Sequence, residues 1–301
     1  MNETNTEIIV ILGPTAVGKS NLAVKCALHF NGEIISADSR QVYKGLDIGT
    51  GKITEKEMLG IKHYVLDVSN PQDKFSVIDF KRLGEKAIEE IKNKGKLPII
   101  CGGTGFYIQN LIDNISLPDV SPNESLRKEL SEKSIETLYE ILLNLDPYFA
   151  NKVDKNNKRK LIRAIEIVKE IGKVPEVKNN ETKYKPIFIG LTLPNDLLKE
   201  RIANRLEKRI EQGMIEEVIE LHKNGLSYQR MDELGLEYRY ISKFLQNELS
   251  FDDMKEKLKT EIWHYAKRQM TWFKKDKRIV WFSPEDEKNI ENYIKNFLLN
   301  N

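Results

Sequence analysis

The sequence predicts an α/β fold: a parallel sheet with helices on both faces, plus an inserted all-helical subdomain. Three observations lead to this prediction. Short β-branched runs alternate along the chain with helical patterns, a glycine-rich loop joins the first run to the first helix, and one stretch of roughly sixty residues has no strand signal. Strands that alternate with helices are typical of parallel sheets.

The strand candidates are short apolar runs, and the helix candidates are longer amphipathic stretches between them. We expect strands at residues 8–12, 33–36, 63–67, 97–101, 187–193 and 278–282. We expect helices at residues 19–30, 77–94 and 197–223.

The stretch without strand signals runs from residue 121 to about residue 181 and shows only charged helical periodicity. Pro118 and Pro122 mark its start, and Pro186 follows its end. A crossover between parallel strands needs about a dozen residues, so an insertion is favoured over ordinary crossover helices. The expected division is a catalytic core in two parts, residues 1–118 and 186–301, around a helical insertion at 119–185.

Composition sets limits on the class of protein. The chain has 301 residues, of which 40% are hydrophobic and 31% charged, enough for a sizeable core. Cys26 and Cys101 lie in apolar runs, which predicts small core residues in a reducing cytoplasm. No run is long enough to span a membrane, residues 1–7 do not resemble a signal peptide, and the four histidines lack metal-ligand spacing. We expect no membrane association.

The chain carries 48 Lys and Arg against 46 Asp and Glu, a net charge of only +2. A nucleic-acid partner must therefore meet local basic patches. One such patch sets six bases between Lys152 and Arg163 against the single acid Asp154. A second sets eight bases against two acids between Lys257 and Arg278, interleaved with Trp263, Tyr265, Trp272 and Phe273. Bases with aromatics suit RNA, although at least half of these aromatics are expected in the core.

The glycine-rich loop fits G-x-x-x-x-G-K-[ST], the P-loop motif, between a strand and a helix. Its backbone amides would curl around an anion, Lys19 would add positive charge, and Ser20 would hold Mg²⁺. A glycine turn that binds nothing is the alternative. The predicted phosphate-binding residues are Gly13, Pro14, Thr15, Ala16, Val17, Gly18, Lys19 and Ser20, and the predicted fold is P-loop kinase-like.

Asp38 follows the second strand, and the carboxyl ends of parallel strands line the ligand crevice. It should therefore face the same crevice as the P-loop, unless it or Ser39 caps a following helix. Strand 97–101 ends in Gly102-Gly103-Thr104-Gly105 and not in the Mg²⁺-binding Asp usual in nucleotide hydrolases. This weakens a hydrolase interpretation and leaves a kinase open.

Five blocks in register resemble the tRNA dimethylallyltransferase (tRNA isopentenyltransferase) family over nearly the whole chain. They are residues 13–20, 38–50 (DSRQVYKGLDIGT), 102–107 (GGTGFY), 163–166 (RAIE) and 268–273 (RQMTWF). The resemblance implies transfer of a dimethylallyl group from dimethylallyl pyrophosphate to N6 of the adenosine 3′-adjacent to the anticodon in tRNA. It also implies Mg²⁺ as cofactor and release of pyrophosphate.

The resemblance implies roles for individual residues. Asp38 would accept the N6 proton, a task that suits a carboxylate, and Thr104 would contact the target nucleotide or, equally, satisfy a glycine-rich turn. Arg201 and Arg205 match an R-I-x-x-R pattern, and Arg205 is preferred for pyrophosphate. Contacts with the tRNA anticodon stem-loop are expected at Asp38, Ser39, Arg40, Gln41, Thr104, Arg127, Arg159, Lys160, Leu161, Ile162 and Arg163. We expect a monomer.

Two positions depart from the family pattern. An I-G-Y-K/R-E segment is only loosely matched by Leu234-Gly235-Leu236-Glu237-Tyr238-Arg239, and Gly51 stands where a small residue, usually alanine, is expected. The alternatives are a P-loop small-molecule or nucleotide kinase, an isopentenyltransferase acting on free adenine nucleotides, and an RNA-binding module without catalysis. A kinase would not explain the 268–273 block, and Asp38 argues against a module without catalysis.

Overall fold

The computed structural model describes residues 6–118, 120–176 and 183–300. Its six strands form one sheet in the order β3-β2-β4-β1-β5-β6, and every neighbouring pair is parallel. The strands are β1 (Thr6–Leu12), β2 (Gly32–Ser36), β3 (His63–Tyr64), β4 (Leu97–Gly102), β5 (Tyr184–Leu191) and β6 (Ile279–Phe282). The predicted α/β fold with a parallel sheet is confirmed.

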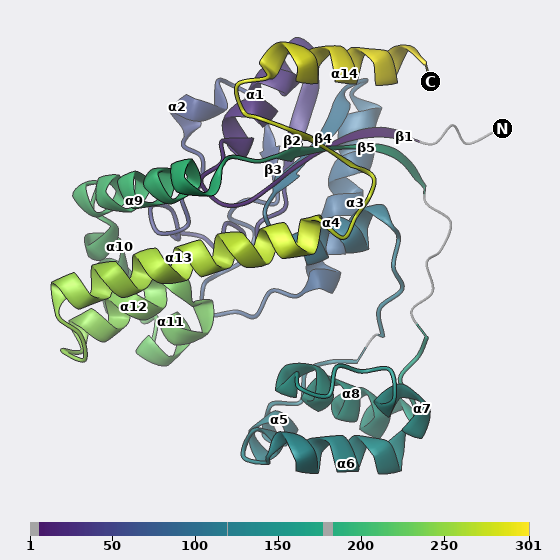
Figure 1. Ribbon diagram of the computed structural model, residues 1–301, viewed down its shortest axis with the longest axis vertical. Helices are drawn as coiled ribbons and strands as arrows, with labels where there is room; N and C mark the ends of the chain where they lie inside the picture. Colours follow the sequence, from purple (N-terminus) through teal and green to yellow (C-terminus); the bar gives the residue numbers. More distant parts are fainter. Residues whose placement is uncertain (1–5, 119, 177–182, 301) are drawn as a thin grey trace. The chain divides into compact units, whose positions relative to one another are not determined.

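Helices flank the sheet on both faces (Figure 1). The helices of this part are α1 (Lys19–His29), α2 (Glu55–Met58), α3 (Val77–Asn93), α4 (Gly105–Ile112), α9 (Asn195–Glu211), α10 (Met214–Lys223), α11 (Tyr228–Leu234), α12 (Leu236–Leu245), α13 (Phe251–Phe273) and α14 (Glu287–Leu299). On one face α1 lies beside α14, joined by the Lys25–Glu287 ion pair; α3 and α4 pack together on the other face.

Two predicted elements differ from the structure. The strand expected at 63–67 ends at Tyr64, because Val65 and Asp67 have positive φ angles of 61° and 54°, which no strand accommodates. The helix expected at 197–223 is two helices, because Gly213 at φ +97° breaks the backbone between α9 and α10.

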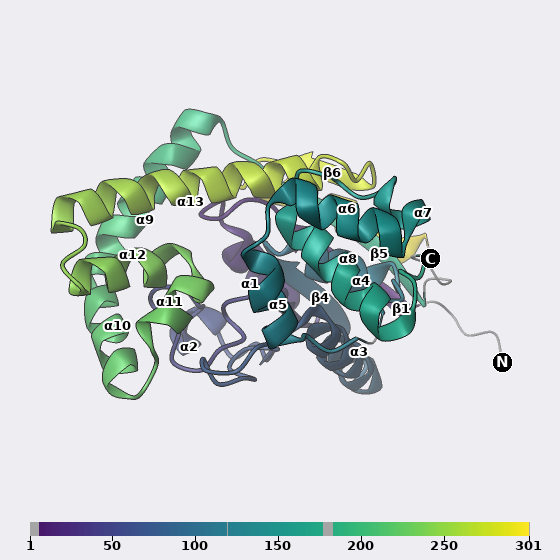
Figure 2. The same cartoon turned by 90° about the horizontal axis from the view of Figure 1, so that it is seen from below.

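The chain separates into two compact units, residues 1–114 with 181–301, and residues 115–180. The described part of the smaller unit is all-helical: α5 (Glu124–Ser131), α6 (Ile135–Leu145), α7 (Pro147–Ala150) and α8 (Lys158–Ile171) (Figure 2). It has its own apolar core, in which Leu138, Leu142 and Ile165 are fully buried. Strand β5 already begins at Tyr184, so 184 and 185 belong to the sheet and not to the insertion.

Candidate active site

The P-loop connects β1 to α1 and leaves the first amides of the helix without a side-chain cap. Gly18 is the N-cap residue with φ +105°, and no side chain caps the helix. Gly13 has φ +145°, and a Cβ there would lie 2.5 Å from the Leu191 carbonyl oxygen of β5. Because neither backbone position tolerates a side chain without strain, the glycines are needed where the motif has them. The uncapped helix start presents amide donors and a favourable dipole to an anion.

Lys19 is held against the loop that precedes it. Its Nζ donates to the Pro14 carbonyl oxygen at 2.7 Å. The pKa of Lys19 is lowered to about 8, mainly by burial and in smaller part by the neighbouring Arg205, against the opposing effects of Cys101 and Asp38. A bound anion would stabilise the charged ammonium. A phosphate ligand would therefore raise the pKa of Lys19 and keep its side chain positively charged.

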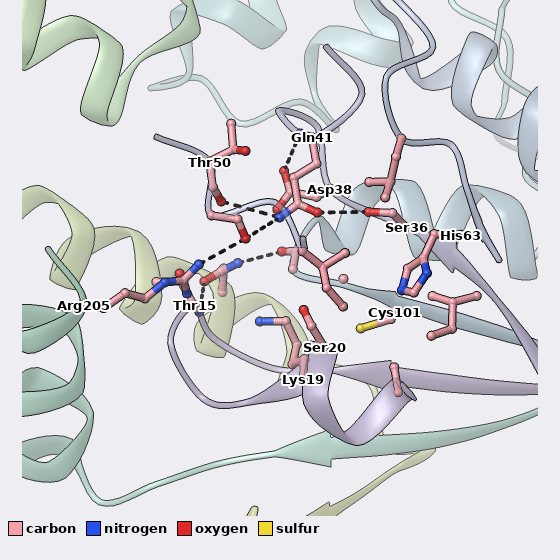
Figure 3. A pocket seen from close by; sticks show the side chains of 18 of the residues that line it. Thr15, Lys19, Ser20, Ser36, Asp38, Gln41, Thr50, His63, Cys101 and Arg205 are labelled. Atoms are coloured by element: carbon pink, nitrogen blue, oxygen red, sulfur yellow. Dashed lines mark hydrogen bonds between the residues drawn. The ribbon is translucent and has the colours of Figure 1, made fainter. Parts of the chain in front are cut away.

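One pocket lies where β1, β2 and β4 end, and it joins residues from distant parts of the chain. In Figure 3, Lys19 and Ser20 point into it from α1, Asp38 and Gln41 come from the segment after β2, and Arg205 approaches from the side opposite His63. Tyr265 and Gln269 of α13 complete the lining. This is the crevice at the carboxyl ends of parallel strands where ligands bind in such sheets.

Asp38 is half-buried in this pocket, and its side chain is held by the backbone of the residues that follow it. Its Oδ1 accepts the amide N–H groups of Arg40 at 2.8 Å and Gln41 at 3.3 Å. The alternative of a helix cap does not apply, because a turn follows Asp38 and the next helix begins at Glu55. Among the described residues, Oδ2 has no hydrogen-bond partner. One carboxylate oxygen thus fixes the turn and the other is available to a ligand.

Thr104 lies next to the Asp38 segment. Its Oγ1 accepts the Ser39 amide N–H at 3.1 Å, and its own amide donates to the Ala37 carbonyl oxygen at 3.1 Å. Although it is the N-cap residue of α4, its side chain does not cap that helix. The hydroxyl therefore ties the end of β4 to the residue after Asp38, and does not merely satisfy its own glycine-rich turn.

The other two predicted contact residues after β2 also hold neighbouring segments. The side-chain nitrogen Nε2 of Gln41 donates to the carbonyl oxygens of Thr50 and Gly51 at 3.5 and 3.3 Å. The Arg40 guanidinium donates to the Glu233 carbonyl oxygen at 3.3 Å. Gln41 lines the pocket, whereas Arg40 does not.

The three arginines of α9 have different surroundings. Arg201 is exposed and Arg205 lines the pocket, whereas Arg209 is buried and pairs with the buried Glu237 at 3.2 Å. Burial lowers the pKa of Arg205 to about 10, with Arg209 as the second cause. Glu237 pairs with Arg209, whereas Arg205 lines the pocket with no carboxylate partner among the described residues. Arg201 donates to the Val17 carbonyl oxygen of the P-loop at 3.5 Å but does not line the pocket. This geometry supports the preference for Arg205 over Arg201.

Gly51 allows this arrangement. It has φ +59°, and a Cβ would lie 1.6 Å from Arg209 Nη2 and 2.0 Å from Arg205 Nη2. Both departures from the family pattern meet here, since Glu237 belongs to the loosely matched 234–239 segment. Burial raises the pKa of Glu237, an effect that Arg209 opposes. The two guanidinium groups occupy space that a side chain at position 51 would take.

Metal donors in the pocket are few. In the described ranges there is no group of three or more His, Cys, Asp or Glu side chains that could hold a metal ion. The Ser20 hydroxyl lines the pocket and is one such donor. Mg²⁺ typically takes one or two protein oxygens and completes its shell with phosphates and waters, so this donor set fits Mg²⁺ bound with a pyrophosphate.

The two cysteines are free and buried, as predicted. Burial raises the pKa of each thiol to about 12, so neither is a thiolate nucleophile at neutral pH. No helix in the described part of the chain is long and apolar enough to cross a membrane.

In the insertion, two predicted tRNA-contact residues are bound to a buried carboxylate. Arg127 donates to Glu166 through Nε and Nη2, both at 2.9 Å, and Arg163 donates to Glu166 and to the Val120 carbonyl oxygen. Burial alone would raise the pKa of Glu166, but its bonds to Arg127, the Asn123 amide and Arg163 outweigh burial and lower it. Arg127 therefore links α5 to α8, and Arg163 links α8 to the segment at Val120.

The remaining insertion residues divide by exposure. Arg159 and Lys160 are exposed on the first turn of α8. Leu161 is fully buried in the insertion core and Ile162 packs against that core. The Leu161 side chain thus faces the interior while its two predecessors face solvent. A tRNA contact at this position stays a prediction and would involve the backbone of Leu161, because the side chain belongs to the core.

The aromatics of α13 also divide by exposure. Phe273 is buried, Trp263 packs against the core and Tyr265 lines the pocket, whereas Trp272 is 43% exposed. A groove beside Trp272 is lined by His264, Lys267, Arg268, Thr271, Trp272 and Lys275, with no acidic residue. This face of α13 is basic and partly aromatic.

Sequence reasoning missed three residues that build the site. Glu217 accepts the amide N–H groups of Asp47, Ile48 and Gly49, and so fixes the loop before Gly51. Glu237 pairs with Arg209, and Gln269 bonds the P-loop. Gln269 lay within a block that was recognised, but nothing in its spacing predicted its partners.

Known proteins match this chain over almost its full length. A family model described as IPP transferase matches residues 41–276. The tRNA dimethylallyltransferase of Acetivibrio thermocellus is 43% identical over 298 residues, 96% of this chain and 95% of that protein. The tRNA dimethylallyltransferase 1 of Syntrophus aciditrophicus is 39% identical over 296 residues, 96% of this chain and 97% of that protein.

Solved structures give the same result. The full-length tRNA isopentenylpyrophosphate transferase of Bacillus halodurans superposes with a TM-score of 0.74 and 35% identity, covering 97% of this chain and 96% of that one. A eukaryotic dimethylallyltransferase acting on tRNA superposes with a TM-score of 0.76 and 30% identity, covering 89% and 69%. The resemblance carried by the five sequence blocks is confirmed, and the chain belongs to the IPP transferase family.

Proposed function

We propose that this chain transfers a dimethylallyl group from dimethylallyl pyrophosphate to N6 of the adenosine 3′-adjacent to the anticodon in tRNA, with release of pyrophosphate. The observation that supports it most is that the P-loop and the carboxylate of Asp38 line one pocket. A phosphate cradle beside a proton acceptor is what the transfer requires. The proposal includes a monomer in the cytoplasm, a reducing compartment that suits two free, buried cysteines.

The chemistry assigns each group a role. The C1–O bond of the donor breaks, and its electron pair leaves with pyrophosphate, whose growing negative charge Lys19, Arg205 and the P-loop amides stabilise. The N6 lone pair forms the new N–C bond. Asp38 takes the N6 proton, so that the product amine is neutral. The Thr104–Ser39 bond holds the segment that carries Asp38.

The Ser20 hydroxyl would hold Mg²⁺ together with the pyrophosphate oxygens. A bound Mg²⁺ supplies neutralising charge to the leaving group. We therefore expect transfer to stop when the divalent ion is removed with a chelator and to return when Mg²⁺ is added back.

Two basic surfaces support an RNA acceptor. The first turn of α8 carries Lys158, Arg159 and Lys160 and no acid. Positive charge is unfavourable at a helix N-terminus, and a bound RNA phosphate would offset this repulsion. The second surface is the acid-free groove of α13, where Trp272 offers a face for base stacking beside Arg268 and Lys275. A small-molecule kinase has no use for either surface.

The test uses an unmodified tRNA transcript with adenosine 3′ of the anticodon, and radiolabelled dimethylallyl pyrophosphate. Label should enter this transcript and not a matched one with guanosine at that position. Parallel reactions contain γ-labelled ATP, or labelled donor with free AMP. Transfer from ATP would favour the kinase alternative, and labelling of AMP in place of tRNA would favour an isopentenyltransferase acting on free nucleotides.

A further inference from the structure

Gln269 lies in the 268–273 block, whose part in the reaction the proposed function leaves open. Its side chain is buried at 6% exposure and lines the pocket. Its Oε1 accepts the Thr15 amide N–H at 2.8 Å, and its Nε2 donates to the Gly103 carbonyl oxygen at 2.9 Å. One side chain of α13 thus bridges the P-loop and the glycine-rich loop after β4.

The bridge is specific in its chemistry. One partner is an N–H donor and the other a carbonyl acceptor, so the amide satisfies both in a single orientation. Space is equally restricted, because a Cβ at Gly103 would lie 2.2 Å from Gln269 Nε2. A glycine at 103 is therefore what allows the glutamine to approach the backbone.

The bridge connects the two halves of the reaction site. Thr15 belongs to the cradle for the leaving group. Gly103 is followed by Thr104, whose hydroxyl accepts the amide N–H of Ser39, the residue after Asp38. A continuous path of bonds thus runs from the pyrophosphate side through Gln269 to the segment that carries the proton acceptor.

We propose that Gln269 is a positioning residue that sets the separation between the pyrophosphate cradle and the Thr104–Asp38 side of the pocket. The proposal rests on the proposed function. A displacement of about 1 Å between reacting groups lowers rates by about 10²-fold. Loss of the bridge should therefore reduce the transfer step more than the binding of either substrate.

Gln269→Met tests the two bonds without removing bulk, because methionine is similar in size and makes neither bond. With saturating tRNA and dimethylallyl pyrophosphate, we expect the single-turnover rate to fall about 10–100-fold, while the donor KM and tRNA affinity change less than threefold. Met254→Ala is the control, since Met254 is fully buried in the same helix. It should lower the Tm and leave the single-turnover rate near wild type.

Gln269→Glu gives a pH signature that packing alone would not produce. A protonated glutamic acid can donate to Gly103 and accept from Thr15 as the amide does, whereas the carboxylate faces the Gly103 carbonyl without a proton. The ratio of the variant rate to the wild-type rate should therefore rise as pH falls from 8 to 6. The wild-type pocket also contains the ionisable side chains of Lys19, Asp38, His63, Cys101, Arg205 and Tyr265. Dividing the variant rate by the wild-type rate at the same pH corrects for their contribution.

A wild-type single-turnover rate in Gln269→Met, or a rate ratio in Gln269→Glu that does not change with pH, would overturn the inference. Equal rate losses in Gln269→Met and Met254→Ala would do the same, because they would assign the effect to a loosened helix. If Gln269→Met does not fold, the pH ratio of Gln269→Glu decides. A wild-type protein without transferase activity would instead contradict the proposed function.

Discussion

Asp38 shows how one carboxylate serves both structure and reaction. Oδ1 accepts two backbone N–H groups and fixes the turn. Asparagine can keep these bonds through its carbonyl oxygen but cannot take a proton. We predict that Asp38→Asn lowers the single-turnover transfer rate by about 10²–10⁴-fold with tRNA affinity nearly unchanged. Single-turnover kinetics and a binding titration measure the two quantities.

The matched control for Asp38→Asn is Asp47→Asn, a carboxylate of the following loop that pairs with Lys52 outside the pocket. Its transfer rate should stay within about threefold of wild type, because the Asp47 side chain is largely exposed and the buried Lys52 keeps its second carboxylate partner, Asp67. A wild-type rate in Asp38→Asn would remove Asp38 from the chemistry and leave it as a turn residue.

Lys19 gives a pH prediction of definite sign. With a pKa of about 8 in the free enzyme, the ammonium is charged below pH 8 and neutral above it. Pyrophosphate binds the charged form, so the donor KM should rise as pH increases beyond 8, by up to about tenfold per pH unit. Arg205 has a pKa of about 10, so it stays charged over most of the pH range in which Lys19 loses its proton.

The measurement is the donor KM from pH 7 to 9.5, with tRNA affinity followed in parallel as the control. Lys19→Ala should nearly abolish transfer while tRNA affinity stays within a few-fold. A donor KM that is constant across this range, or an equal loss of tRNA affinity in Lys19→Ala, would mean that Lys19 does not face the pyrophosphate.

At the scale of elements, α8 begins with three bases and no acid. Arg163 is unsuitable for mutation, because its removal would leave Glu166 with one fewer partner in a buried position. We predict that replacing Arg159 and Lys160 with alanine weakens tRNA binding. The slope of log affinity against log salt should fall by about one unit for each RNA phosphate that the variant no longer neutralises.

The control for the α8 prediction is Lys169→Ala, an exposed lysine at the other end of the same helix. Fluorescence binding titrations at several salt concentrations provide the slopes. If affinity and slope stay at wild-type values in the double variant, the two side chains form an ordinary solvated face.

At the scale of the whole molecule, the described residues form two separate apolar cores, one in the sheet unit and one in the insertion. Leu142 is fully buried in the second. We predict that Leu142→Ala, a change that costs about 2–5 kcal/mol, speeds amide hydrogen exchange in residues 120–176. Strands β1 and β4 should keep their protection.

Hydrogen-exchange mass spectrometry with peptides from both units measures this effect. The matched variant is Ile100→Ala, at a fully buried position of β4, which should deprotect the sheet. An equal loss of protection throughout the chain in Leu142→Ala would show that the two cores unfold together.

The sequence by itself determined the parallel α/β fold, the insertion and the P-loop. Each depends on a local pattern: alternation of strand and helix periods, absence of strand signals over some sixty residues, and eight consecutive residues whose spacing fixes a backbone shape. Asp38 also followed from a local rule, because a residue just after a parallel strand lies at the ligand edge of the sheet.

Only the tertiary structure showed which distant residues hold the site together. Gln269 lies 254 residues from Thr15 and 166 from Gly103, and Arg209 lies 160 residues from the Gly49 carbonyl oxygen that it contacts. Periodicity predicts which face of a helix is buried, but not which distant backbone groups that face will meet. Those partners depend on how helices α9 and α13 pack against the strand ends, and such packing has no signature within one segment of sequence.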